Sequence, residues 1–194
     1  MARLPLVEKD GASEEVLRFF GKVSGWLSTE PGPRAAQAVA RVPQPWRALA
    51  HSPKLAEIVY DGSSYILSSL PWAQEHLRLR QLMILAVTRR LGCEFAYVGH
   101  WPHTQKAGIS REMFDQFATV EGLEAAKTSD AFTEEERLLI TYADDLARTG
   151  NASPVLFEQV HARWGPRGAV EITAIVGYRM FTSVMINAFG LEDD

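Results

Sequence analysis

The chain has little cysteine, no excess of positive charge and no apolar run in its first ten residues. Cys93 is the single thiol among 194 residues, so no disulfide can form within one chain. The 20 Lys and Arg residues against 24 Asp and Glu residues give a formal net charge of -4, which provides no basic field for nucleic acid. Residues 1–10 lack the apolar core of a secretory signal. We therefore expect a cytoplasmic protein that does not bind nucleic acid.

The most apolar stretch, residues 169–189, is about as long as a membrane span, which needs roughly 20 apolar residues. It contains Glu171, Arg179 and Asn187, and such groups are costly in hydrocarbon. In a core helix or a subunit contact they can find polar partners instead. We expect a buried helix here and no association with a membrane.

Helix start and stop signals recur along the chain, whereas the alternation typical of half-buried strands does not occur. Ser52 and Ser153 each precede a proline, which places an N-cap residue before a residue that needs no backbone N–H. Two helices are therefore predicted to begin near residues 53 and 154. The fold class that follows is all-α.

Two more helices have predictable ends. Thr133 and Glu136 form a capping box, and the helix that follows should end at Gly150. Residues 77–91 are apolar nearly all round, so this helix should be buried on most sides. Gly92 follows it in the position that favours a left-handed conformation.

We expect one domain over residues 1–194, because the chain is long enough to bury one substantial core. Residues 1–50 are interpreted as an N-terminal helical arm and connector, and residues 51–194 as the core. The connector, residues 31–45, carries four prolines, although residues 35–42 are compatible with a helix.

The residues after Gly92 carry the candidate chemistry. Cys93 is predicted to lie in the first turn of a helix, where unpaired N–H groups and the helix dipole favour a thiolate. Tyr97 and His100 follow at spacings that place them on the same face, so a thiol, a phenol and an imidazole should converge. Pro102 interrupts or bends this helix, which leaves the direction of His103 open.

Each of these residues also has a structural interpretation. A lone cysteine is commonly a small buried hydrophobic residue, and a lone histidine can be a core imidazole with a backbone partner. Tyr97 and Trp101 fit packing better than catalysis. Arg80, with Arg78 and His76 nearby, could hold a substrate carboxylate, although a solvated or intersubunit charged face is the commoner role.

Segments around this motif resemble the carboxymuconolactone decarboxylase family, of which AhpD is the redox branch. The matching segments are residues 79–82, 92–95, 100–102 and 107–110, followed by residues 135–138, 143–146, 171–179 and 187–190. The pattern extends over about residues 4–191. The resemblance implies an AhpD-like helical bundle that assembles as a trimer or a hexamer, sometimes built from dimers.

In the redox branch a glutamate, a Cys-x-x-Cys pair and a histidine form a proton relay that serves a dithiol. The matching positions in this chain are Gln81, Cys93, Ala96 and His100. Ala96 removes the second thiol, and Gln81 can hydrogen-bond but cannot exchange a proton near neutral pH. We therefore exclude a two-cysteine peroxidase of the AhpD type.

The decarboxylase branch implies cofactor-free proton transfer on a small unsaturated lactone acid. Loss of carbon dioxide leaves electron density on the adjacent carbonyl system, which needs a stabilising dipole and an acid that reprotonates carbon. His100 fits that acid because the ordinary histidine pKa of about 6.5 lies near neutrality. Gln81 would orient the substrate or His100, and Cys93 would line the pocket or donate weakly. The candidate substrate contacts are Tyr97, Trp101, His103 and Arg80.

The leading hypothesis is an acid–base decarboxylase, isomerase or lyase that acts on a small carbonyl- or lactone-containing acid without a cofactor. The first alternative is a one-cysteine peroxidase or redox sensor, in which Cys93 forms a sulfenic acid that an external thiol reduces. The second is a non-catalytic oligomeric binding protein, an interpretation that the changes at Gln81 and Ala96 support.

A metal site and self-association were also weighed on the residues. Cys93, His100 and His103 have a spacing that softer metals accept, but a fourth ligand is not evident, so no metal is expected. Residues 77–91 and the apolar C-terminal helix together exceed the needs of one small core. We expect a homo-oligomer that acts on a small-molecule substrate.

Overall fold

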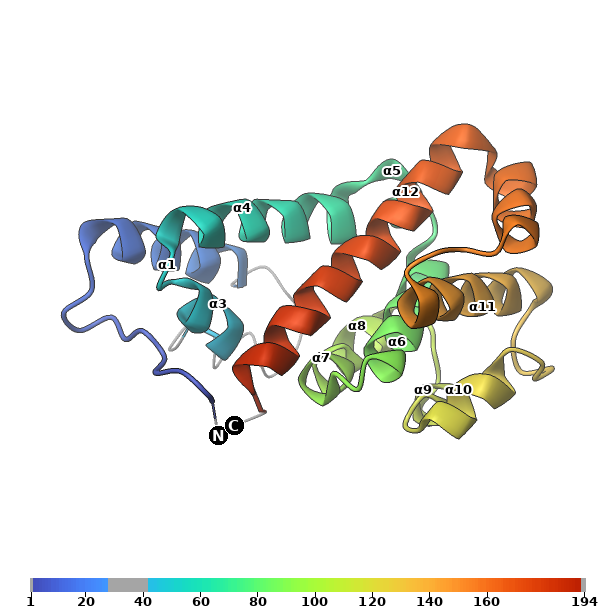
Figure 1. The fold of residues 1–194 in the computed structure, drawn as a ribbon, viewed down its shortest axis with the longest axis horizontal. Coiled ribbons are helices and arrows are strands. Elements are labelled where there is room, and N and C mark those ends of the chain that lie inside the picture. Colours follow the sequence, from blue (N-terminus) through green and yellow to red (C-terminus); the bar gives the residue numbers. More distant parts are fainter. Residues whose placement is uncertain (1, 28–41, 193–194) are drawn as a thin grey trace. The chain divides into compact units, whose positions relative to one another are not determined.

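The computed structural model describes residues 2–27 and 42–192, which form helices and turns with no strand among them (Figure 1). The all-α fold class is confirmed. The proposed helix at residues 35–42 falls almost wholly outside the described residues. In chain order the helices are α1 (Glu14–Leu27), α3 (Gln44–Leu49), α4 (Pro53–Ser64), the π-helix η1 (Tyr65–Ser69), α5 (Pro71–Glu75), α6 (Leu77–Arg90), α7 (Glu94–Gly99), α8 (Trp101–Lys106), α9 (Arg111–Gln116), α10 (Val120–Ala126), α11 (Glu134–Thr149) and α12 (Pro154–Phe189).

The chain divides into two compact units, residues 1–64 with 188–194, and residues 65–187. In the first unit α4 packs against α1 and α3, so this unit extends past residue 50, where the sequence suggested that the arm ends. Its core is aromatic, because the rings of Phe19, Trp46 and Tyr60 meet edge to face.

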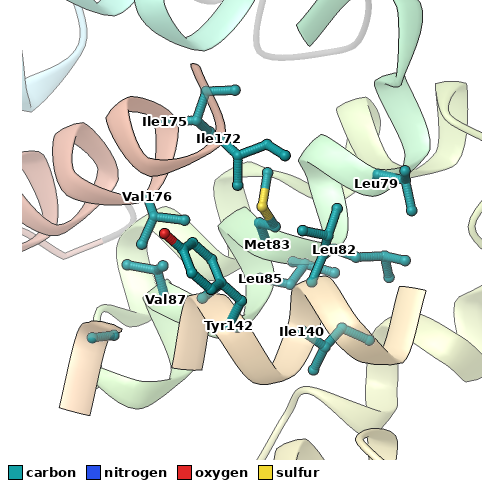
Figure 2. Packing of buried hydrophobic residues seen from close by; sticks show 14 of the residues in the cluster. Leu79, Leu82, Met83, Leu85, Val87, Ile140, Tyr142, Ile172, Ile175 and Val176 are labelled. Atoms are coloured by element: carbon teal, nitrogen blue, oxygen red, sulfur yellow. The ribbon is translucent and has the colours of Figure 1, made fainter. Parts of the chain in front are cut away.

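The second unit is built around α6, which packs most extensively against α11 (Figure 1). Residues 81–88 of α6 are all buried, which confirms that this apolar helix is enclosed on most sides. Figure 2 shows Met83 of α6 and Ile172 of α12 pointing toward one another, with Tyr142 of α11 beside Val176. The buried Tyr142 hydroxyl is 2.7 Å from the Thr173 hydroxyl, so its polar end is satisfied within the core.

The helix starts predicted from serine–proline pairs are confirmed. Pro53 begins α4 and Pro154 begins α12. The Ser153 hydroxyl accepts a hydrogen bond of 3.3 Å from a backbone N–H in the first turn of α12, as expected of an N-cap residue.

The predicted helix ends are confirmed as well. The Thr133 side chain accepts from the Glu136 N–H, and the Glu136 carboxylate accepts from the Thr133 N–H, which completes the capping box of α11. Gly150 follows α11 with φ of 73°, and Gly92 follows α6 with φ of 62°. Glycine populates this left-handed region without the steric cost that a Cβ imposes, so both helices end where glycine occurs.

A sharp break divides α12. Gly165 has φ of 66° and ψ of -177°, which are not helical values, and Pro166 follows it. Proline provides no backbone N–H to continue the hydrogen-bond ladder, so residues 154–164 and 166–189 form two helical segments. By length and composition α12 could cross a membrane, a criterion that core helices of soluble proteins also meet.

The buried acidic residue of α12, Glu171, has partners inside the second unit. The buried Glu171 carboxylate accepts from the Trp72 backbone N–H at 2.8 Å and from Arg167 at 2.8 Å. Burial raises the pKa of Glu171, but these two donors outweigh it and hold the pKa below its ordinary value. An acidic residue in this apolar stretch is therefore accommodated as a charged group.

Candidate functional site

The segment after Gly92 differs from the single helix expected there. Cys93 is the N-cap residue of α7, with φ of -88° and ψ of 79°, rather than a residue of its first turn. The helix ends at Gly99, and α8 begins at Trp101 with Pro102 in its first turn. His100 therefore lies at the junction of two short helices, and no continuous helical face connects it to Cys93.

Tyr97 contributes to the hydrophobic core. Its hydroxyl donates to the Phe114 carbonyl at 2.9 Å, and its ring stacks on the Phe114 ring with centroids 4.4 Å apart. The Arg89 guanidinium lies over the Tyr97 ring at 4.5 Å, and burial raises the pKa of Tyr97 to about 12. Both ends of this side chain are used in packing, so the expected convergence of phenol, thiol and imidazole is not found.

His100 lies between an amide and a guanidinium. Its Nδ1 is 3.1 Å from Oε1 of the buried Gln81, and its Nε2 is 2.7 Å from Nη2 of Arg179. A guanidinium can only donate, so Nε2 must be the acceptor and the ring proton must reside on Nδ1, where Gln81 accepts it. The two contacts therefore define a neutral imidazole with a single tautomer.

Arg179 is a buried cation, with 7% of its surface exposed. No carboxylate among the described residues pairs with it, and its Nε has no hydrogen-bond partner there. Burial lowers the pKa of Arg179 to about 10, because the charged form has lost its hydration. A buried charge is costly unless it is paired, so this side chain is the most unusual polar group of the second unit.

Cys93 is fully buried next to Arg179 and Ser183. Burial raises the pKa of Cys93 and outweighs the opposite effects of the Ala96 N–H, Ser183 and Arg179, so the group is a thiol at neutral pH. Ser183 lies close enough to affect that pKa, yet its buried Oγ makes no hydrogen bond of normal geometry to any described residue.

We call the group formed by Gln81, Cys93, His100, Arg179 and Ser183 the His100 cluster. It draws on α6, the start of α7, the α7–α8 junction and α12, all within the second unit. Arg179 is its centre, since it contacts His100 directly and acts electrostatically on Cys93. The cluster combines a proton acceptor, a positive charge and two small donors.

The other predicted substrate contacts are His103, Trp101 and Arg80. The His103 ring is tilted against the His100 ring at 5.4 Å between centroids. Trp101 meets Phe114 edge to face at 5.0 Å and lies beneath Arg111 at 5.1 Å, which is a packing arrangement. Arg80 is half-buried on α6, next to Gln81 in the sequence.

Neither the neighbours of Arg80 nor a metal site adds to the cluster. Arg78 donates to the Glu136 carboxylate and to the Gly108 carbonyl, which ties α6 to α11 and to the α8–α9 turn. His76 stacks on Trp72 with centroids 4.7 Å apart. Within residues 2–27 and 42–192, no three His, Cys, Asp or Glu side chains come together as metal ligands.

Arg179 and Ser183 are two residues of the cluster that were not predicted from the sequence. Both lie on α12, one helical turn apart, and Arg179 is 79 residues from its partner His100. One signal was available, because Arg179 is the single basic residue of the apolar stretch 169–189. An ionisable residue in such a stretch needs a specific partner or a function.

An open depression of about 560 Å³ lies elsewhere, against α11 and the first segment of α12. Its lining includes Lys127, Glu134, Arg137 and Arg163, and no residue of the His100 cluster contributes to it. Charges of both signs line it, and Arg163 already pairs with Glu135. Geometry alone singles out the His100 cluster as the candidate site, since no family model, no curated protein and no solved structure matches this chain.

Proposed function

We propose that the chain is a cofactor-free acid–base enzyme that acts on a small carbonyl- or lactone-containing acid. The observation that carries the proposal is the neutral His100 held in one tautomer between Gln81 and the unpaired cation Arg179. Nε2 is the basic nitrogen of that tautomer, and it faces the group best able to stabilise an oxyanion. The reaction type is a decarboxylation, an isomerisation or a lyase reaction.

The chemistry follows from the positions of the two nitrogen groups. A substrate carbonyl oxygen that takes the Nη2 donor of Arg179 releases Nε2 of His100, which can then remove a proton next to that carbonyl. The electron pair moves onto the carbonyl oxygen as an enolate, which the guanidinium stabilises. The imidazolium then returns the proton to carbon. In a decarboxylation the bond to the carboxylate carbon breaks, carbon dioxide leaves, and the same guanidinium stabilises the enolate that keeps the electron pair; water supplies the proton that reaches carbon through His100.

Hydrogen exchange tests this proposal before the natural substrate is known. Small oxo acids and lactone acids are incubated with the protein in D2O, and loss of the hydrogen next to the carbonyl is followed by proton NMR. We expect exchange that His100→Ala slows by about 10²- to 10⁴-fold. His161→Asn, which changes a histidine of the first segment of α12, is the matched control. Exchange that is insensitive to His100→Ala, or absent with every acid, would contradict the proposal.

We further propose that the chain is a single-cysteine member of the carboxymuconolactone decarboxylase family. Support comes from Gln81 and His100, which occupy the relay positions of the resemblance and form a hydrogen bond with each other, and from Cys93 beside the same arginine. A crystal structure with the helix order and the assembly of that family would support membership. A different order of helices in the bundle would contradict membership of the family.

Self-association is proposed on the outer face of α12. Val170, Gly177, Phe181 and Val184 are exposed and lie on one side of this helix. Such an apolar stripe favours a homo-oligomer, and the family resemblance favours a trimer or a hexamer. Analytical ultracentrifugation of Phe181→Glu should show dissociation, whereas Phe157→Glu, at an equally exposed phenylalanine of the first segment, should not. A monomeric wild type would overturn this proposal.

A second candidate function is a one-cysteine peroxidase, and the contacts of Cys93 with Ser183 and Arg179 favour it. A thiolate would attack the peroxide, so that an S–O bond forms, the O–O bond breaks and an alcohol leaves. The raised pKa of the buried Cys93 opposes this reaction. Peroxide loss and sulfenic acid formation, measured with an organic hydroperoxide and an external thiol, decide between the two, with Cys93→Ser as the variant.

We propose that the protein is located in the cytoplasm. A single thiol suits a reducing compartment, and the three charged residues of the second segment of α12 have partners or contacts within the second unit. Carbonate extraction of cells that express the chain tests this. Recovery in the soluble fraction would support it, and retention in the membrane pellet would assign α12 to the bilayer instead.

A further inference from the structure

Two buried polar groups of the His100 cluster, both on α12, lack a hydrogen bond of normal geometry. Arg179 Nε and Ser183 Oγ are on α12, one turn apart on the same face. Arg179 Nε has no hydrogen-bond partner among the described residues, and Ser183 Oγ has the Cys93 thiol beside it but no hydrogen bond of normal geometry. Ser183 is fully buried and Arg179 is more than nine-tenths buried. Buried donors are almost always satisfied in folded proteins, so this pair indicates an acceptor that the chain itself does not provide.

The electrostatics at this place are unbalanced. The described groups that act on Arg179 are the Cys93 thiol, the His100 imidazole and the Tyr178 phenol, and none of them is a carboxylate. With a pKa of about 10, Arg179 still carries its full charge at pH 7. A single positive charge therefore carries one unmatched donor, its own Nε–H, and lies near a second, the Ser183 hydroxyl.

The chemistry of these donors selects the ligand. One carboxylate carries a single negative charge and accepts both an N–H and an O–H, so it matches Arg179 Nε and Ser183 Oγ in charge and in number. A phosphate group carries up to two negative charges at neutral pH and three acceptor oxygens, which exceeds what this site offers.

We propose that Arg179 Nε and Ser183 Oγ, beside Cys93, form a subsite that binds the carboxylate of a small monocarboxylic acid. The rest of the assignment rests on the proposed function, in which Nη2 of the same guanidinium binds the substrate carbonyl next to His100. One guanidinium then binds both groups of the acid. The substrate class is an acid whose carbonyl lies one or two bonds from the carboxylate carbon, such as a 2-oxo or a 3-oxo acid.

Formate is the probe that tests the subsite, because it is the smallest carboxylate and has no second carbonyl to react. Formate is titrated into the folded protein at constant ionic strength, and the arginine Nε–H resonances are followed by ¹⁵N NMR. We expect one resonance to shift and saturate, and Arg179→Lys identifies it by removing it. Ser183→Ala should weaken formate binding by about tenfold, while Arg163→Lys, on the first segment of α12, leaves it unchanged.

Three results would overturn the subsite. They are an Arg179 Nε–H resonance that formate does not move, equal formate affinity in wild type and Ser183→Ala, and chloride acting as strongly as formate. Should Arg179→Lys not fold, the magnetisation transfer between this Nε–H and Ser183 assigns the resonance in wild type.

The formate titration and the hydrogen-exchange experiment can contradict the subsite and the proposed function independently. If the protein binds formate but exchanges hydrogen in no oxo acid, the carboxylate subsite is supported and the proposed enzymatic activity is contradicted. If hydrogen exchange depends on His100 but the protein does not bind formate, the proposed enzymatic activity is supported and the carboxylate subsite is contradicted.

Discussion

Two arginines of the second unit show opposite ways of placing a cation away from water. Arg90 donates to the Asp144 carboxylate and to Glu124, and Lys127 also reaches both of these acids. Arg179 has an imidazole, a thiol and a hydroxyl as neighbours, and no described carboxylate. The first cluster is electrostatically complete, whereas the second becomes complete when an anion binds.

The pKa values of the two arginines differ in the same way as their surroundings. The hydrogen bond to Asp144 raises the pKa of Arg90, whereas burial lowers that of Arg179. Burial alone would raise the pKa of Asp144, but hydrogen bonds from Arg90 and Lys127 bring it below its ordinary value. We infer that the Arg90 cluster stabilises the fold and that the His100 cluster was retained for chemistry, since an unpaired buried charge adds no stability.

The largest effect should come from breaking the complete cluster. Asp144 is 1% exposed, and Asp144→Ala leaves Arg90 and Lys127 without their common partner. We expect a loss of about 3–5 kcal/mol in the free energy of unfolding, measured with urea. Asp115→Ala, which removes an exposed partner of Arg111, is the control and should cost less than about 1 kcal/mol. Similar costs for the two variants would remove the distinction between these carboxylates.

The pH dependence of stability gives a second test of the Arg90 cluster. The folded-state pKa of Asp144 is lowered, so the unfolded chain binds its proton first as the pH falls. Its contribution is complete above the unfolded pKa of about 3.9 and disappears as the pH falls through the folded value. Urea unfolding of wild type between pH 7 and pH 2 should show this loss, and Asp144→Asn should reduce it. Parallel profiles for the two proteins would be evidence against the assignment.

Arg179→Met should affect stability in the opposite way to the Asp144 change. Methionine replaces a buried cation that has no anion, so we expect the free energy of unfolding to stay the same or to rise by about 1 kcal/mol. The matched variant Arg90→Met leaves Asp144 buried with less compensation and should be clearly destabilised. Urea unfolding of both variants measures the contrast. Equal destabilisation would mean that Arg179 is structural.

The smallest effect is expected from Gln81→Glu, which should change the pKa of His100 more than the stability of the fold. In Gln81→Glu a carboxylate oxygen takes the position of the amide oxygen, 3.1 Å from Nδ1 of His100. The negative charge favours the imidazolium, so we expect the pKa of His100 to rise in this variant. A raised histidine pKa adds stability below the unfolded pKa of about 6.5, and this gain disappears as the pH rises through the folded value. NMR titration of His100 measures the shift, with Gln159→Glu as the control. An unchanged titration would show that Gln81 does not govern this ring.

Rules that act over a few residues predicted much of the fold. The capping box at Thr133 and the glycines after α6 and α11 were recognised because each satisfies backbone groups within one or two turns. The burial of α6 followed from its apolar composition, which leaves no polar face for water. These features need no knowledge of how distant segments pack.

The candidate site was predicted only in part, because half of it depends on distant packing. Cys93, His100 and Gln81 were selected from the sequence, but the break after Gly99 gave them a different geometry from that of one helix. The pairing of His100 with Arg179 spans 79 residues, and local spacing carries no information on it. The turn of α12 at Gly165 was also not foreseen, although Gly-Pro is a common breaker.

Because Cys93 is the single cysteine of the chain, a spectroscopic probe can be attached to the His100 cluster alone. Cyanylation of Cys93 above its raised pKa would attach a nitrile group at a unique site, without removing other thiols first. Its infrared stretching frequency depends on the local electric field, and the Arg179 guanidinium is the charge that acts most strongly on Cys93. The band would therefore report directly on whether that charge is bare or neutralised.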